Sequence, residues 1–185
     1  MTEIRTSRVW LRRWRVEDRE AFAALNADPV VMEYFPAVLS RAESDELADR
    51  IEAHFARNGF GLWAVEVPGA HLFAGFLGLS TPSFQAHFTP CVEVGWRLSR
   101  EAWGKGYATE GARAVLAFGF EQLGLDEIVA LTVPANLGSR RLMERLGMRH
   151  SPADDFEHPS LPAGHPLRHH VLYRLARGDW ESQAT

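Results

Sequence analysis

The sequence predicts an α/β fold, an α+β arrangement in which helices flank one mixed sheet, in the order β-α-α-β-β-β-α-β-α-β-β. Two patterns predict it. Apolar and polar residues alternate in several short segments, which is the period of a strand. Between these segments, apolar residues recur every three or four positions, which marks one face of a helix. This order favours an antiparallel meander followed by one parallel crossover.

The N-terminal segments are expected to form one strand and two short helices. Alternation predicts the strand over residues 8–14, and Asp18 is expected to cap the first helix. The pair Asp28-Pro29 is expected to start the second helix, which Pro36 ends.

A longer helix and a hairpin follow. Ser40 and Glu43 have the spacing of a capping box, and Gly59 is expected to end the helix behind them. Strands are predicted over 61–67 and 72–79, joined at a Pro-Gly turn. The next stretch, up to Pro90, has no periodic pattern and is expected to be a loop.

The second half alternates strands with helices. Val92, Val94 and Trp96 alternate with Glu93, Gly95 and Arg97, so the latter three share one face of a central strand. The remaining elements expected are a helix over 108–122, a strand over 126–133, a helix from Asn136 to Gly147, a long loop over 149–169 with a short strand at each end, and a last strand over 170–175.

The turn between the central strand and its helix contains Gly104 and Gly106. The first turn of a helix has backbone N–H groups without intrahelical partners, and its dipole favours negative charge. Glycines let the backbone approach an anion without a Cβ in the way. The turn therefore predicts a pyrophosphate site, and the alternative is a tight turn that needs glycine for its conformation alone. Neither a P-loop nor a complete Rossmann glycine pattern is present.

Composition indicates a single domain over residues 1–185. Hydrophobic residues make up 46% of the chain and charged residues 24%, as in ordinary globular proteins. The net charge of −4 argues against nucleic acid as a partner. One cysteine, Cys91, no long apolar run and no signal-peptide pattern lead us to expect a cytoplasmic protein without membrane contacts.

The segment Trp-Gly-Lys-Gly-Tyr-Ala-Thr-Glu, residues 103–110, resembles motif A of the GNAT N-acetyltransferases, in its RimJ/RimL-type form. The family carries Gln/Arg-Gly-x-Gly-x-Gly/Ala here, around the pyrophosphate of acetyl-CoA. Gly104, Gly106 and Ala108 match, whereas Trp103 replaces the leading Gln/Arg. The resemblance implies the single-domain GNAT fold, with splayed central strands, and acetyl-CoA as cosubstrate.

The resemblance also implies which residues bind that cosubstrate. On the central strand, the main chain of Trp96, Arg97 and Leu98 is expected to bond the pantetheine arm and the acetyl carbonyl, and ordinary strand pairing is the alternative role. The other positions expected to bind acetyl-CoA are Trp103, Gly104, Lys105, Gly106, Tyr107, Ala108, Thr109, Asn136 and Ser139.

Glu93 is the candidate general base. It lies between the apolar Val92 and Val94, and partial burial raises the pKa of a carboxylate toward a value suited to deprotonating an ammonium. The family resemblance implies the same role, often through a water. The alternative is an outward-facing Glu93 paired with Arg97 or Arg113.

Asn136 and Ser139 resemble a second element of the family, Asn-x-x-Ser/Ala before a helix. The resemblance implies that Asn136 bonds the pantetheine arm and that Ser139, a candidate catalytic residue, lies near the thioester sulfur. The alternative for Asn136 is a helix cap. Many relatives place a tyrosine seven residues after the Asn to protonate the thiolate, but here that residue is Met143. Ser139, a water or unassisted departure of the thiolate would have to replace it.

Five histidines fall between residues 150 and 170. Their spacing matches no compact zinc pattern, so we expect no metal and favour a loop that shapes the acceptor site or a subunit contact. His87 is an alternative base. Of the aromatic residues Phe35, Trp63, Phe76 and Phe84, most are expected in the core and one or two beside the acceptor.

Taken together, these patterns predict an N-acetyltransferase that moves an acetyl group directly from acetyl-CoA to a primary amine. The acceptor is a protein N-terminus or a small-molecule amine, and relatives suggest a homodimer. Two alternatives stay open: an acyl-CoA-binding module without activity, and a transferase of a different acyl group. A nucleotide-binding module of another class would instead bind ATP or NAD.

Overall fold

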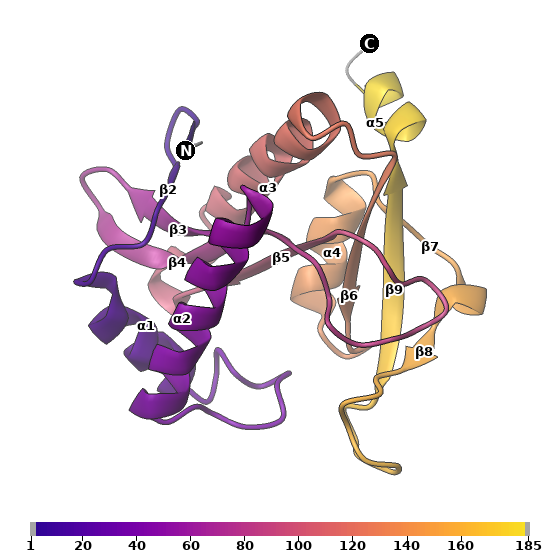
Figure 1. Cartoon of the computed structure of the whole chain (residues 1–185), viewed down its shortest axis with the longest axis horizontal. Helices are drawn as coiled ribbons and strands as arrows, with labels where there is room; N and C mark the ends of the chain where they lie inside the picture. Colours follow the sequence, from indigo (N-terminus) through magenta and orange to yellow (C-terminus); the bar gives the residue numbers. More distant parts are fainter. Residues whose placement is uncertain (1–2, 184–185) are drawn as a thin grey trace. The chain divides into compact units, whose positions relative to one another are not determined.

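The computed structural model describes residues 3–183, which form two compact units within the fold drawn in Figure 1. The first unit comprises residues 3–80 and 95–115, and the second comprises residues 81–94 and 116–183. Strand β5 (Glu93–Leu98) and helix α3 (Tyr107–Ala117) contribute to both units. Within residues 3–183, no helix has the length and apolar character needed to cross a membrane.

The sheet of the first unit is antiparallel from β1 to β4. Its strands are β1 (Ile4–Arg5), β2 (Trp10–Arg12), β3 (Leu62–Val67) and β4 (His71–Ser80), and β5 follows β4 in the sheet order. β2 confirms the strand expected over 8–14 but is shorter, and β1 was not predicted. The hairpin between β3 and β4 is confirmed, with Gly69 at φ 78° in its turn.

Two helices complete this part of the chain, α1 (Asp18–Ala27) and α2 (Arg41–Asn58). The capping box before α2 is confirmed: the Ser40 hydroxyl accepts from the Glu43 N–H, and the Glu43 carboxylate accepts from the Ser40 N–H at 2.7 Å. Gly59 follows in the left-handed region at φ 75°. Local sequence therefore determines both ends of α2.

Two predictions for the N-terminal region are wrong. Asp18 is the first helical residue rather than the cap, which is Glu17, because its carboxylate is bonded to the Arg12 guanidinium and to the Arg15 N–H. The helix expected from Asp28-Pro29 is also absent from the described chain, since residues 29–37 form turns and bends instead.

Side chains of β4 alternate between two apolar layers. Phe76 faces α1, where its ring lies 5.9 Å from the ring of Phe22. Leu77 faces α3, where a Cβ added to Gly111 would lie 3.2 Å from the Leu77 side chain. The sheet of the first unit is therefore covered on both faces.

The buried guanidinium of Arg12 is fully paired. Its Nε donates to Glu66 at 2.6 Å, and its two terminal nitrogens form a two-pronged ion pair with Asp18 at 2.7 and 2.8 Å. The backbone carbonyls of Arg13 and Leu72 accept the remaining bonds. The Arg12 side chain is only 1% exposed, so this cluster joins β2, α1, β3 and β4 inside the unit.

The second unit contains a mixed sheet. Its strands are β6 (Glu127–Thr132), β7 (Arg149–His150), β8 (Phe156–Glu157) and β9 (His169–Ala176). The first residue of β5, Glu93, pairs with Val129 of β6 in parallel, and β6 is antiparallel to β9. β7 and β8 both pair with β9, so the long loop carries a short strand at its start and another near its middle.

The helices of the second unit are α4 (Leu137–Arg145), the short α5 (Arg177–Gln183) and a π-helical turn (Phe118–Gln122) that continues α3. Its core includes Phe88, Val129, Phe156 and Leu172, with Phe84 packed against them. Phe84 is thus one of the aromatic residues that belong to a core. The predicted mixed α/β order is confirmed, with β1, β8 and α5 as additions.

The Arg12 cluster gives a stability prediction. Arg12→Met leaves the Asp18 carboxylate buried without a cation and leaves Glu66 with only its ion pair to Arg15. Breaking a buried pair typically destabilises a protein by about 3–5 kcal/mol. Urea denaturation measures this loss. The matched control is Arg41→Met, which removes an exposed i,i+4 pair with Asp45 and is expected to change stability by less than about 0.5 kcal/mol. Similar losses in both variants would contradict the role of the cluster.

Candidate active site

The predicted anion site lies in the first unit, where a glycine turn leads into α3. Gly104 and Gly106 have φ values of 71° and 83°, in the left-handed region that favours glycine. The first intrahelical bond runs from the Glu110 N–H to the Gly106 carbonyl, at 3.0 Å. The N–H groups of Tyr107 to Thr109 therefore precede the ladder and can bind an anion.

Trp103 caps this turn. Its indole N–H donates to the Leu98 carbonyl at 2.8 Å, and its ring is 47% exposed. The bond joins the end of β5 to the start of the glycine turn. Where the family motif has Gln or Arg, this chain therefore has an indole, Trp103, that is hydrogen-bonded to the main chain.

Arg8 is a residue near this turn that sequence reasoning missed. Its Nε donates to the Glu110 carboxylate at 2.6 Å, and its Nη1 donates to the Lys105 carbonyl at 2.9 Å. A Cβ added to Gly106 would lie 3.2 Å from Arg8 Nη2. The guanidinium therefore lies against the glycine turn, beside the predicted phosphate position. The two segments are about a hundred residues apart, so no local pattern could have indicated this contact.

The Glu110 carboxylate in the first turn of α3 is held by four donors: the hydroxyls of Thr6 and Ser7, and the N–H and Nε of Arg8. Desolvation acts to raise the pKa of Glu110, but the hydrogen bonds from Thr6, Arg8 and Ser7 outweigh it and lower this pKa to about 2. Glu110 is thus a compensated anion that secures α3 to the N-terminal turn.

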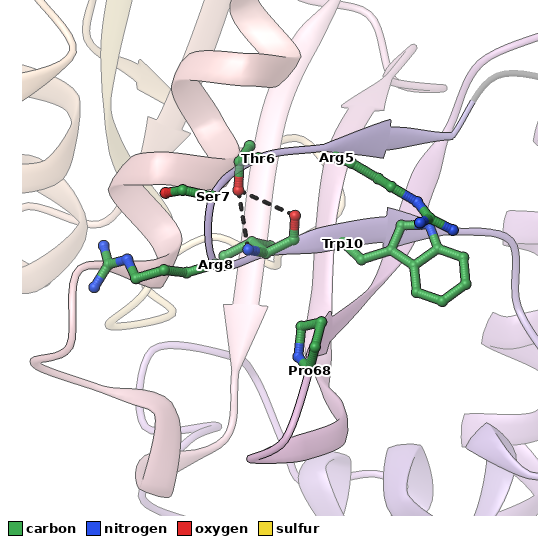
Figure 2. Close-up of a pocket in the computed structure, with 7 residues that line it drawn as sticks. Arg5, Thr6, Ser7, Arg8, Trp10 and Pro68 are labelled. Atoms are coloured by element: carbon green, nitrogen blue, oxygen red, sulfur yellow. Dashed lines mark hydrogen bonds between the residues drawn. The ribbon is translucent and has the colours of Figure 1, made fainter.

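That N-terminal turn also borders a small pocket of about 180 Å³ (Figure 2). The Arg5 guanidinium lies 4.0 Å above the Trp10 ring, and the Arg8 side chain extends away from them. The residues that line the pocket are Arg5, Thr6, Ser7, Arg8, Val9, Trp10 and Pro68.

The C-terminal half of β5 carries the predicted main-chain contacts of Trp96, Arg97 and Leu98. β4 approaches this strand closely at Gly75, whose φ is 132° and where an added Cβ would lie 2.1 Å from the Arg97 carbonyl oxygen. No side chain fits at that position, so Gly75 is required for the close approach of the two backbones. The Arg97 side chain bonds Asn26 Oδ1, so within the first unit it is engaged with α1.

Glu93, the predicted base, starts β5 in the second unit. Desolvation raises the pKa of its carboxylate to about 7. Among residues 3–183 it has no hydrogen-bond or ion-pair partner, so the alternative of a paired surface carboxylate is not what the structure contains. A carboxylate with a pKa near neutrality is suited to accept a proton from an amine. Nearby, desolvation and the charge of Glu93 raise the pKa of Cys91 to about 11, which disfavours a thiolate nucleophile.

Asn136 and Ser139 lie at the start of α4. The side-chain Oδ1 of Asn136 accepts from the Ser139 N–H at 3.1 Å, and its side-chain Nδ2 donates to the Thr132 hydroxyl at 3.0 Å. Asn136 is therefore the helix cap, as the simpler interpretation held, and its predicted contact with pantetheine stays a prediction. Met143 is buried and has no ionisable group. The Tyr173 hydroxyl is already bonded to Arg140 and Glu144.

The C-terminal histidines are distributed over several pairs. His150 bonds Asp155 at 2.7 Å and His169 bonds Glu157 at 3.1 Å. His87 lies 3.7 Å from the Asp154 carboxylate. In the described part of the chain, no three side chains of the His, Cys, Asp or Glu type converge as metal ligands would.

Comparison with known proteins identifies the family of the chain. The family model described as an acetyltransferase (GNAT) domain matches residues 8–149. FsC-acetyl coenzyme A-N(2)-transacetylase from Aspergillus fumigatus is 30% identical over 173 residues, which cover 89% of this chain and 72% of that protein. The uncharacterized N-acetyltransferase YnaD from Bacillus subtilis is 26% identical over 180 residues, covering 96% of this chain and 98% of the relative.

Solved structures share the fold. A GNAT-family acetyltransferase from Bacillus anthracis is 25% identical and superposes with a TM-score of 0.77, covering 96% of this chain and 99% of that one. The family match spans both compact units, from before β2 into β7. The chain therefore belongs to the GNAT family and is an N-acetyltransferase.

Proposed function

We propose that this N-acetyltransferase uses acetyl-CoA and transfers the acetyl group directly to a primary amine, either a protein N-terminus or a small-molecule amine, as in the RimJ/RimL-type branch. The observation that carries the proposal is the glycine turn at the start of α3, where Gly104 and Gly106 both have positive φ. The name of the Aspergillus relative, which includes acetyl coenzyme A, supports the choice of donor.

The residues of the turn fit a pyrophosphate. Free N–H groups of Tyr107, Ala108 and Thr109 and the positive end of the α3 dipole would bind the phosphate oxygens. Arg8 Nη2 adds an N–H donor next to Gly106. Glu110 does not oppose binding, because Arg8 and two hydroxyls compensate its charge. Main-chain groups of residues 96–98 and the Asn136 amide would hold the pantetheine arm.

The chemistry requires a base, an oxyanion donor and a proton for the departing thiol. The thioester supplies an activated acetyl carbonyl. Glu93 would take the proton from the ammonium form of the acceptor, directly or through a water. An N–H of the strand segment 96–98 would stabilise the oxyanion. Ser139 or a water would protonate the thiolate, which is also a modest base that can leave without help.

A second candidate is an acyl-CoA-binding module without activity, which Met143 favours because it cannot act as an acid. A third is transfer of another acyl group, since the turn contacts only the CoA part of the donor. Thiol release with an amine present separates the second candidate from the enzyme, and a comparison of acyl-CoA donors separates the third. Cytoplasmic location stays a prediction from the sequence composition, and a homodimer stays a prediction from the family resemblance.

Binding of acetyl-CoA at the glycine turn is tested by calorimetric titration. We expect wild-type binding with a Kd of roughly micromolar magnitude, as is common for enzyme substrates. Gly106→Trp is expected to abolish binding, because a bulky side chain at φ 83° displaces the phosphate. The matched control is Gly164→Trp, where φ is 81° and nothing lies within 4 Å of an added Cβ. Failure of every CoA ester to bind the wild type would overturn the proposal.

The role of Glu93 predicts a pH profile. Since its pKa is raised to about 7, the basic form appears as pH rises through that value, and kcat/KM should increase with an inflection near pH 7. Glu93→Gln should lower kcat by about 10²–10⁴-fold and remove the inflection. An unchanged profile in the variant would assign the proton transfer to another group, with His87 next to be tested.

Stability provides a control for the same variant. Glu93 holds its proton more tightly in the folded state, so its contribution to stability is fully present below about pH 4.5 and is lost as pH rises through about 7. Glu93→Gln removes the desolvated charge. The variant should therefore match the wild type in melting temperature at pH 5 and exceed it at pH 8. A lower melting temperature at both pH values would mean that the loss of activity reflects misfolding.

A further inference from the structure

Arg97 is a largely buried cation without a carboxylate partner. Its Nη1 donates to Asn26 Oδ1, and its Cζ lies 4.0 Å from the centre of the Phe35 ring and 5.2 Å from that of Phe76. Its Nε–H is enclosed and has no acceptor among residues 3–183. The same part of the chain provides no ion pair for this guanidinium.

This setting is electrostatically costly. The free-energy cost of removing a cation from water is offset when carboxylates surround it, as they do around Arg12. Arg97 is instead surrounded by one amide oxygen and two aromatic ring faces. Desolvation lowers the pKa of Arg97 to about 10. Asp28, the C-cap residue of α1, forms its ion pair with Arg100 at 3.6 Å. An anion that binds at Arg97 would therefore gain a pair that the protein itself does not supply.

The donors that remain have the geometry of a fork. Asn26 accepts from Nη1, which leaves the Nε–H and Nη2 groups along one edge of the guanidinium without acceptors among residues 3–183. Two parallel N–H groups on that edge match the two oxygens of a carboxylate. Phe35, whose ring lies against the guanidinium, is 37% exposed and belongs to the turn segment 29–37.

Arg97 belongs to the segment 96–98 of β5, whose main chain is proposed to hold the acetyl carbonyl. A group bound by its side chain would therefore lie close to the reacting end of the donor, where the acceptor must also bind.

We propose that Arg97 binds a carboxylate of the acceptor, so that the preferred acceptors are amines that carry a carboxylate, such as free amino acids or short acidic peptides. This inference rests on the proposed function, because it assigns the acceptor class of the same site. Asn26 then acts as a positioning residue, which holds Nη1 and turns the free edge of the guanidinium toward the ligand.

The first experiment compares matched acceptors. Amino acids and their α-amides, for example alanine with alaninamide, are assayed by thiol release from acetyl-CoA. We expect kcat/KM to favour the acceptor with the additional carboxylate by at least about tenfold, since sites built for a polar group reject analogues without it. Arg97→Gln should reduce this ratio to about one. Equal use of acids and amides by the wild type would overturn the proposal.

Two further variants separate recognition from folding. Arg100→Gln removes a neighbouring exposed cation and should leave the acid-to-amide ratio unchanged. Asn26→Asp is nearly isosteric and supplies an internal carboxylate to Arg97, so it should preserve or raise the melting temperature while lowering the ratio toward one. If Arg97 has only a structural role, Asn26→Asp leaves the ratio as in the wild type, and this result also overturns the proposal.

A binding measurement does not depend on catalysis. The Arg97 Nε–H resonance, assigned by its loss in Arg97→Gln, is followed by ¹⁵N–¹H NMR during titration with acetate or with acetamide. We expect a saturable shift with acetate only, absent in Asn26→Asp. If acetyl-CoA fails to bind but acetate still shifts Arg97, the proposed function fails and the anion site stands. If amines are acetylated but acetate produces no shift, the inference about Arg97 fails alone.

Discussion

The first unit depends on compensating a buried guanidinium. Arg12 uses its N–H groups on Asp18, Glu66 and two backbone carbonyls, and in doing so it connects β2 to α1, β3 and β4. A desolvated cation without these partners would be strongly unfavourable. The four elements can therefore pack around Arg12 only when its charge is paired. The same constraint explains why Asp18 does not cap its helix: its carboxylate is required by Arg12.

Arg97 is also a guanidinium removed from water, but no carboxylate among residues 3–183 compensates its charge. It is partly buried like a structural arginine, but it contacts aromatic rings and an amide where Arg12 contacts carboxylates. Local rules of this kind are usually broken where a protein binds something. The net charge of −4 is too small to select an acceptor at long range, whereas a guanidinium acts at contact distance.

Sequence patterns located the elements whose determinants are local. The Ser40–Glu43 box, the left-handed glycines at 59 and 69 and the alternation of β5 and β6 depend on neighbouring residues, and they were predicted. The turns and bends of residues 29–37 were not predicted, because an Asp-Pro pair favours the start of a helix but does not by itself stabilise a short one. The glycine turn could be found from its motif. Arg8 could not, since its partner Glu110 is 102 residues away, and only the folded chain brings the two together.

Glu110 illustrates how the anion site avoids a conflict. The first turn of a helix attracts any negative charge, so an acidic residue there competes with a phosphate for the same N–H groups and the same dipole. Here the carboxylate is turned to the N-terminal segment, where Thr6, Ser7 and Arg8 supply four donors. Its charge is compensated by those donors, and the N–H groups of the glycine turn are left for a ligand. The acidic residue therefore anchors α3, while the glycines and Arg8 provide the surface that an anion would meet.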